Sequence, residues 1–137
     1  MNTNDELNGR YVLVRPDLRN DPESRKNQVG VIQSADLPRD DIVIRFYDGR
    51  HGLFASDALL VLKNTDHIRA YANADYNELL RDEYHDIMEV CFLADLAHPK
   101  GKQAALELVS KSPMALEYAT ITIEEQLGLN ASIKIGR

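Results

Sequence analysis

The sequence predicts an α+β protein in which short strands come first and helices follow. Residues 10–63 hold five short runs rich in β-branched and aromatic residues, separated by Gly, Pro and Asp. Residues 64–137 hold longer segments whose apolar residues recur at helical spacing. A length of 137 residues suits one medium domain or two small ones. We therefore expect a flexible leader at 1–9, a strand region at 10–63 and an acidic helical region at 64–137.

Alternating apolar residues define the strands of the first region. In the strongest run, Ile42, Ile44 and Phe46 share one face, and Asp48–Gly49 follows at once as a tight-turn signal. Gly30 indicates a bend or bulge in an earlier run. A polar loop at 16–28 and a helical turn at 56–59 connect the runs, and long loops of this kind are often functional. The expected strands are 10–15, 28–34, 41–47, 51–55 and 60–62.

The order of these elements resembles the SH3-like small β-barrel superfamily, which includes KOW and Tudor barrels. Three segments carry the resemblance: 29–32 (VGVI), 43–49 (VIRFYDG) and 56–62 (SDALLVL). It covers residues 10–63 and implies a closed five-stranded barrel. Barrels of this kind bind RNA, methylated or proline-rich peptides, or partner subunits, so the resemblance alone assigns no function.

Helical periodicity and capping residues organise the second region. The segment 76–96 places Leu80, Ile87 and Cys91 on one face, and Ser112–Pro113 is a favourable helix start. The expected helices are 66–74, 76–96, 102–111 and 113–127, which gives three or four helices. The β-branched run within 118–124 fits a strand as well as a helix. The alternating segment 131–135 would suit an added edge strand.

Charge is unevenly distributed along the chain. The net charge is −6, with nine Lys and Arg against ten Asp and Glu in residues 1–63, and seven against twelve in residues 64–137. Nucleic-acid binding needs a positive surface, so it is expected through the barrel only. The polar start of the chain lacks a secretory signal and no apolar run is long enough to cross a bilayer, so we expect a cytoplasmic protein without membrane contact.

Two groups of residues suggest chemistry but favour simpler interpretations. Glu78, Asp82, His85 and Glu89 recur on one helix face and resemble part of a di-iron motif, but that face is opposite the apolar stripe. We interpret it as a solvated acidic face that is free to contact a partner. His51 near Asp57 would suit acid–base work, but no nucleophile motif accompanies it.

Aromatic residues and the single cysteine also favour structural interpretations. A Tudor-like cage would need clustered exposed aromatics, whereas Phe46 alternates with core residues and the chain has no Trp. Cys91 lies between apolar neighbours and is expected to be a buried small hydrophobe. The sequence contains no enzyme, cofactor or metal motif, so we predict no catalytic residues, no cofactor and no metal site.

The remaining interpretation is a non-enzymatic protein-interaction module that acts as an accessory or adaptor protein and forms a homodimer or binds another protein. The alternative is a transcription- or RNA-associated regulator that uses the barrel. Basic residues near the long loop and the Asp48–Gly49 turn, with one neighbouring tyrosine, provide the candidate contact surface. These partner-binding candidates are Arg19, Arg25, Lys26, Tyr47, Arg50 and His51.

Overall fold

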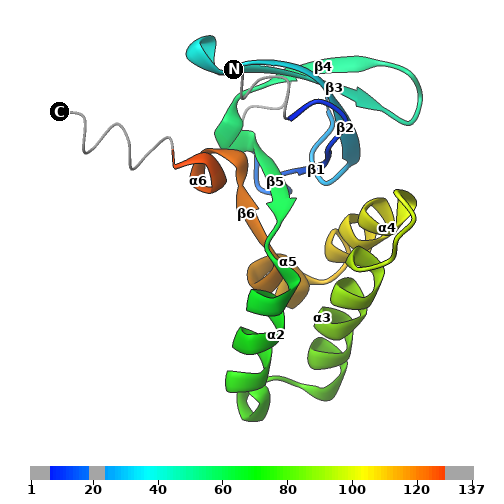
Figure 1. The fold of residues 1–137 in the computed structure, drawn as a ribbon, viewed down its shortest axis with the longest axis vertical. Coiled ribbons are helices and arrows are strands. Elements are labelled where there is room, and N and C mark those ends of the chain that lie inside the picture. The colour runs from blue at the N-terminus through cyan, green and yellow to red at the C-terminus, as the bar shows by residue number, and fades with distance from the viewer. Residues whose placement is uncertain (1–6, 19–23, 129–137) are drawn as a thin grey trace, which may run out of the picture. The chain divides into compact units, whose positions relative to one another are not determined.

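The computed structural model describes residues 7–18 and 24–128 and has an α+β fold (Figure 1). The strands and 3₁₀ turns are β1 (Tyr11–Val14), β2 (Val29–Asp36), η1 (Leu37–Arg39), β3 (Asp41–Phe46), β4 (His51–Phe54), η2 (Ser56–Ala58), β5 (Leu59–Leu62), η3 (Tyr76–Glu78) and β6 (Thr120–Thr122). The α-helices in this part of the chain are α2 (Thr65–Ala74), α3 (Arg81–Ala94), α4 (Lys100–Val109), α5 (Pro113–Ala119) and α6 (Ile123–Leu127).

The strands form an open sheet, so the predicted closed five-stranded barrel is wrong. The strand order is β4-β3-β2-β1-β5-β6, with antiparallel pairing along β4-β3-β2-β1-β5. A barrel closes only when its two outer strands pair with each other. Here η2 carries the chain from β4 across to β5 beside β1, and β6 adds at the far edge. The sheet therefore keeps two edges, β4 and β6.

The five predicted strands are individually confirmed, and the helical turn predicted at 56–59 is the 3₁₀ turn Ser56–Ala58. In β3 the alternation works as expected, because Ile42, Ile44 and Phe46 are buried while Arg45 is exposed. Their buried face contributes to one hydrophobic core. Its members are Leu7, Val12, Val14, Ile32, Ile42, Ile44, Phe46, Phe54, Ala58, Leu59, Val61 and Ile123.

Gly30 has a packing role and not the predicted bulge. It pairs regularly with Val12 and with Phe46, and the register shift of β2 lies further on, between Ile32 and Ser34. A Cβ atom at position 30 would lie 2.4 Å from Ile44 Cγ2 and 3.2 Å from Phe46 Cδ1. Glycine here leaves the space that these two core side chains occupy.

The chain divides into two compact units. One contains the described residues up to Val61 together with those from Ile121 onward, and the other is Leu62–Thr120. In the second unit α3 contacts α2, α4 and α5, and Figure 1 shows α2 and α3 side by side. Ile68, Ala72, Ile87, Val90 and Cys91 are buried there.

The helices differ in detail from the predicted ones. The segment 76–96 is a 3₁₀ turn followed by α3, because Leu80 is extended and its N–H donates to Glu83 Oε1 at 2.8 Å. Leu80 is consequently 69% exposed and not part of the apolar stripe. The segment 118–124 combines both alternatives, since α5 ends at Ala119, β6 follows, and α6 begins at Ile123. The predicted strand 131–135 lies outside the described residues.

Candidate functional site

The end of the β3–β4 hairpin carries the candidate site. The turn is tight, because the Phe46 N–H donates to the Arg50 carbonyl and the Gly49 N–H donates to the Phe46 carbonyl, both at 2.9 Å. Gly49 has φ +84°, a conformation that glycine adopts without strain. The Arg50 N–H donates to Asp48 Oδ1 at 3.0 Å. Asp48–Gly49 is thus the tight turn that the sequence predicts.

Arg25, in the loop between β1 and β2, holds this turn in place. Its guanidinium donates to Asp48 Oδ2 at 2.9 Å and to Gln28 Oε1 at 3.0 Å, and it lies 4.5 Å from the centre of the Phe46 ring. Only 11% of the Arg25 side chain is exposed. The Arg25 guanidinium is therefore used in intramolecular contacts, which connect the loop, the turn and the core.

Asp48 is held as a carboxylate by these contacts. The Arg50 N–H, and after it the Arg25 guanidinium, lower the pKa of Asp48 below its usual range. Both hydrogen bonds favour the ionised form of the carboxyl group. The turn geometry is therefore set before any ligand arrives.

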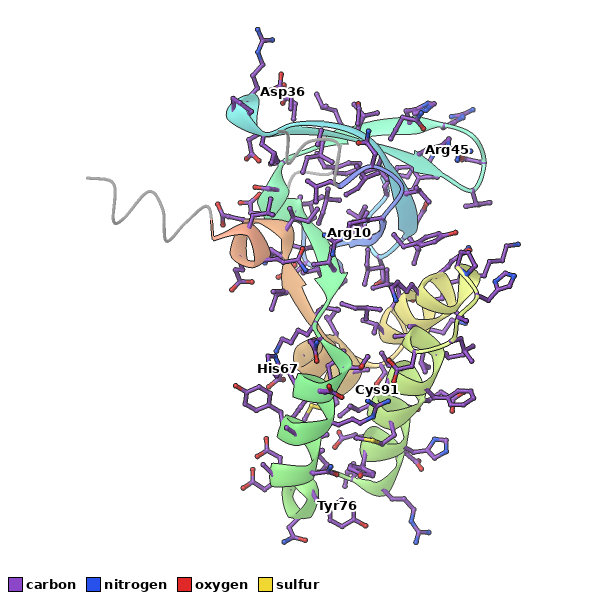
Figure 2. The ribbon with its side chains drawn as sticks, in the orientation of Figure 1. Arg10, Asp36, Arg45, His67, Tyr76 and Cys91 are labelled. Atoms are coloured by element: carbon purple, nitrogen blue, oxygen red, sulfur yellow. The ribbon has the colours of Figure 1, made fainter. Side chains whose placement is uncertain are left out.

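Four exposed side chains surround the preset turn. Tyr47 is 87% exposed, and Arg45, Arg50 and His51 are exposed as well. Arg45 on β3 is opposite His51 on β4, and Figure 2 shows Arg45 near the hairpin end. Across residues 7–18 and 24–128, these three basic side chains form no ion pair. We call Arg45, Tyr47, Arg50 and His51 the hairpin surface.

The structure thus brings together Arg25, Tyr47, Arg50 and His51 from the predicted set. Lys26 is exposed next to Arg25. Arg19 lies outside the described residues. Arg45 is not among the predicted partner-binding residues, although its alternation with Ile44 and Phe46 already placed it outward beside the turn.

The residues suggested for an acid–base pair and for an aromatic cage do not come together. Within the described chain no hydrogen bond or ion pair joins His51 to Asp57, which lies in η2. Phe46 and Phe54 are buried and meet edge to face, with ring centres 6.0 Å apart. Tyr47 points into solvent away from them, so these aromatics form no cage around a cation.

The acidic helix face is solvent-exposed, as expected. Glu78, Asp82, His85 and Glu89 are all exposed. Residues 7–18 and 24–128 contain no group of three or more His, Cys, Asp or Glu that could hold a metal ion. A search of the same residues finds no helix with the length and hydrophobicity needed to span a membrane.

A small cavity in the second unit was missed by the sequence analysis. It measures about 240 Å³ and is lined by Lys63, Tyr71, Asp75, Glu117 and Tyr118. The Tyr118 hydroxyl donates to Asp75 Oδ2 at 2.5 Å, which raises the pKa of Tyr118 to about 12. The Lys63 ammonium lies 5.7 Å from the centre of the Tyr71 ring. These residues come from two segments, 63–75 and 117–118, that are far apart in sequence and share no motif, so no local signal brings them together.

Comparisons with protein-family models, with curated proteins and with solved structures found no match for this chain. The function of the candidate site must therefore be inferred from its geometry and charge.

Proposed function

We propose that this chain is a non-enzymatic protein-interaction module whose hairpin surface contacts an acidic region of a partner protein. One observation carries the proposal: a highly exposed tyrosine, Tyr47, stands among three exposed basic side chains on a turn that Arg25 and Asp48 hold in place. Tyrosine and arginine are the residues most often responsible for binding energy at protein interfaces. A rigid turn also lowers the entropy lost on binding.

Charge complementarity indicates the nature of the partner. The chain as a whole carries a net charge of −6, whereas the hairpin surface is locally basic. A local basic patch on an acidic protein favours one orientation of approach and repels other acidic encounters elsewhere on the surface. An acidic partner surface is the best match for Arg45, Arg50 and His51.

Affinity capture with the full chain as bait tests this proposal. The double variant Tyr47→Ala, Arg50→Ala should lose at least about 90% of a captured partner, since two central contacts together exceed about 2 kcal/mol. The matched control is Tyr76→Ala, Arg81→Ala, which removes an exposed Tyr and an exposed Arg from the second unit. Equal loss in both double variants, or retention in the hairpin variant, would contradict the proposal.

Nucleic acid is the second candidate ligand of the same surface. An exposed aromatic ring beside arginines is also the arrangement that stacks unpaired bases and pairs with phosphates. A transcription- or RNA-associated role would require salt-sensitive binding of a single-stranded RNA oligonucleotide that Arg45→Ala and Arg50→Ala weaken. Absence of such binding at low salt would eliminate this candidate and leave the protein partner.

A further inference from the structure

We propose that the partner contributes an extended acidic segment that adds to β4 as a further strand of the sheet. This inference rests on the proposed function, because it specifies how a protein partner engages the hairpin surface. It follows from the open sheet: a closed barrel would have no free strand at this position. Three features of β4 carry it, namely its backbone, its outward side chains and the charge beside it.

The backbone of β4 has donors and acceptors directed away from β3. Phe46 donates to the Arg50 carbonyl, and the register pairs Ile44 with Gly52 and Ile42 with Phe54. In an antiparallel ladder, pairs that exchange hydrogen bonds alternate with pairs that do not. His51 and Leu53 are therefore the non-bonded positions, and their N–H and C=O groups project from the sheet edge. An incoming strand would bond to these two residues.

The side chains on the same strand define what the incoming segment should carry. His51 and Leu53 are both exposed, Leu53 by 57%, and they lie opposite Arg45 and Val43 on β3. Directly opposed residues on neighbouring strands interact most strongly, and alternate residues share a face. An incoming strand that places an acidic residue opposite His51 and an apolar residue opposite Leu53, two positions away, would be complementary to both side chains. The expected motif has an Asp or Glu and an aliphatic residue two positions apart, with the acidic residue first in a parallel strand and second in an antiparallel one.

Charge disfavours the two other natural occupants of this edge. Pairing with a second copy would bring two sets of Arg45, Arg50 and His51 towards one another at a shared edge. The chain's own segment 129–137 has two basic residues, Lys134 and Arg137, and no acidic residue. Like charges facing each other across strands are unfavourable, whereas an acidic strand gains from the same residues.

The first test is titration of the isotope-labelled full chain with the peptide acetyl-Thr-Val-Thr-Glu-Thr-Val-Thr-amide, which places a valine two positions from the glutamate in either strand direction. Binding should slow hydrogen exchange of the His51 and Leu53 amides at least about tenfold, because both become hydrogen-bonded. A peptide of the same composition with both valines next to the glutamate, acetyl-Thr-Thr-Val-Glu-Val-Thr-Thr-amide, should bind more weakly, as should the version of the first peptide with Lys in place of Glu. Equal binding by all three peptides would overturn strand addition.

The variant Leu53→Pro is the second test. Proline at an outward-facing edge position removes a docking donor without removing a bond between β3 and β4. It should weaken binding of the first peptide at least about tenfold, and His51→Ala should weaken it less. If Leu53→Pro does not fold, the exchange measurement on the unchanged chain decides alone. Deletion of residues 129–137 should leave the affinity for the peptide unchanged. A higher affinity after the deletion would identify that segment as the natural occupant of the β4 edge.

The results separate this inference from the proposed function. If Tyr47→Ala, Arg50→Ala abolishes partner capture while the peptide gives no protection at His51 and Leu53, the hairpin binds partners by side chains alone and strand addition is wrong. If the hairpin variants retain the partner, both proposals are wrong. Dimerisation through β4, seen as protection that depends on protein concentration without peptide, would assign the edge to a second copy and overturn the acidic segment.

Discussion

The Arg25 guanidinium donates a hydrogen bond of 2.9 Å to Asp48, a residue 23 positions further along the chain. The same guanidinium lies over the Phe46 ring, at the base of the hairpin. This relationship connects an irregular loop to a surface turn and to the core. It has a measurable consequence for stability.

The variant Arg25→Ala should lower the free energy of unfolding by about 1–2 kcal/mol, through loss of two hydrogen bonds and of packing on Phe46. Urea unfolding measures the change. The control Arg39→Ala removes a side chain that is 79% exposed and 3.8 Å from Asp36, and should change stability by less than about 0.5 kcal/mol. Similar effects of the two variants would show that Arg25 is no more than an ordinary surface charge.

The variant Gly101→Ala should destabilise the second unit by about 1–3 kcal/mol. A Cβ atom at this position would lie 2.4 Å from the backbone carbonyl oxygen of Leu93, which cannot move without distorting α3. The usual gain from replacing glycine by alanine in a helix is smaller than this cost. Thermal unfolding followed by circular dichroism measures the change.

Gln103→Ala, in the same helix, is the control for Gly101→Ala. Gln103 makes only an exposed contact of 3.3 Å to Glu107, so its loss should be almost neutral. A Gly101→Ala protein that is as stable as wild type would show that α3 and α4 pack less closely than the structure has them.

Tyr118 should titrate later than an ordinary tyrosine. Its hydrogen bond to Asp75 raises its pKa from 10.0 to about 12, so the native state holds a proton that the unfolded state releases. The resulting stabilisation is fully present below pH 10 and is lost as the pH rises towards 12. The difference in melting temperature between wild type and Tyr118→Phe should therefore shrink between pH 9 and pH 12, a range that spans the two pKa values.

Near-ultraviolet absorbance, which changes when a tyrosine ionises, gives a direct measurement of the same effect. In wild type, Tyr118 should give an ionisation step well above pH 10. In Asp75→Asn this late step should move back towards pH 10, because the carboxylate that opposes ionisation is gone. A late step that persists in Asp75→Asn would point to another tyrosine.

Cys91 should be unreactive in the folded protein. It is fully buried, its Sγ lies 3.9 Å from the Thr65 carbonyl oxygen, and burial raises its pKa, which reduces the thiolate fraction at any given pH. Labelling by a thiol reagent at pH 8 should be at least about a hundredfold slower than in denaturant, since it requires local opening. Fast labelling without denaturant would contradict the packing of α3 against its neighbours (Figure 2).

Local patterns in the sequence predicted the individual elements well. The alternation of Ile42, Ile44 and Phe46 requires one buried face, and Asp48–Gly49 specifies a turn without help from the rest of the chain. The strand order could not be obtained in this way. Whether β4 meets another strand depends on where η2 directs the chain, and no residue in β4 encodes that direction.

The candidate site was predictable as a location but not in its division of roles. Arg25 and Arg50 are equivalent in a list of basic residues near the turn. Only the fold shows that Arg25 is enclosed by Phe46 and Asp48, while Arg50 remains exposed. The helix starting at Arg81 was misplaced for a related reason, because the Glu83 carboxylate that accepts the Leu80 N–H acts as a cap and not as a surface charge.

The core of the first unit contains both Val61 and Ile123, and the whole of Leu62–Thr120 lies between them in the chain. A ribosome therefore completes the second unit before it makes a fully buried member of the first. Part of the apolar surface of the N-terminal strands therefore stays uncovered until α6 has emerged from the ribosome. The second unit is an insertion whose ends meet, since the Lys63 N–H donates to the Ala119 carbonyl at 2.8 Å. The first unit, whose strands are synthesised first, can thus complete its core only after the second unit has been made.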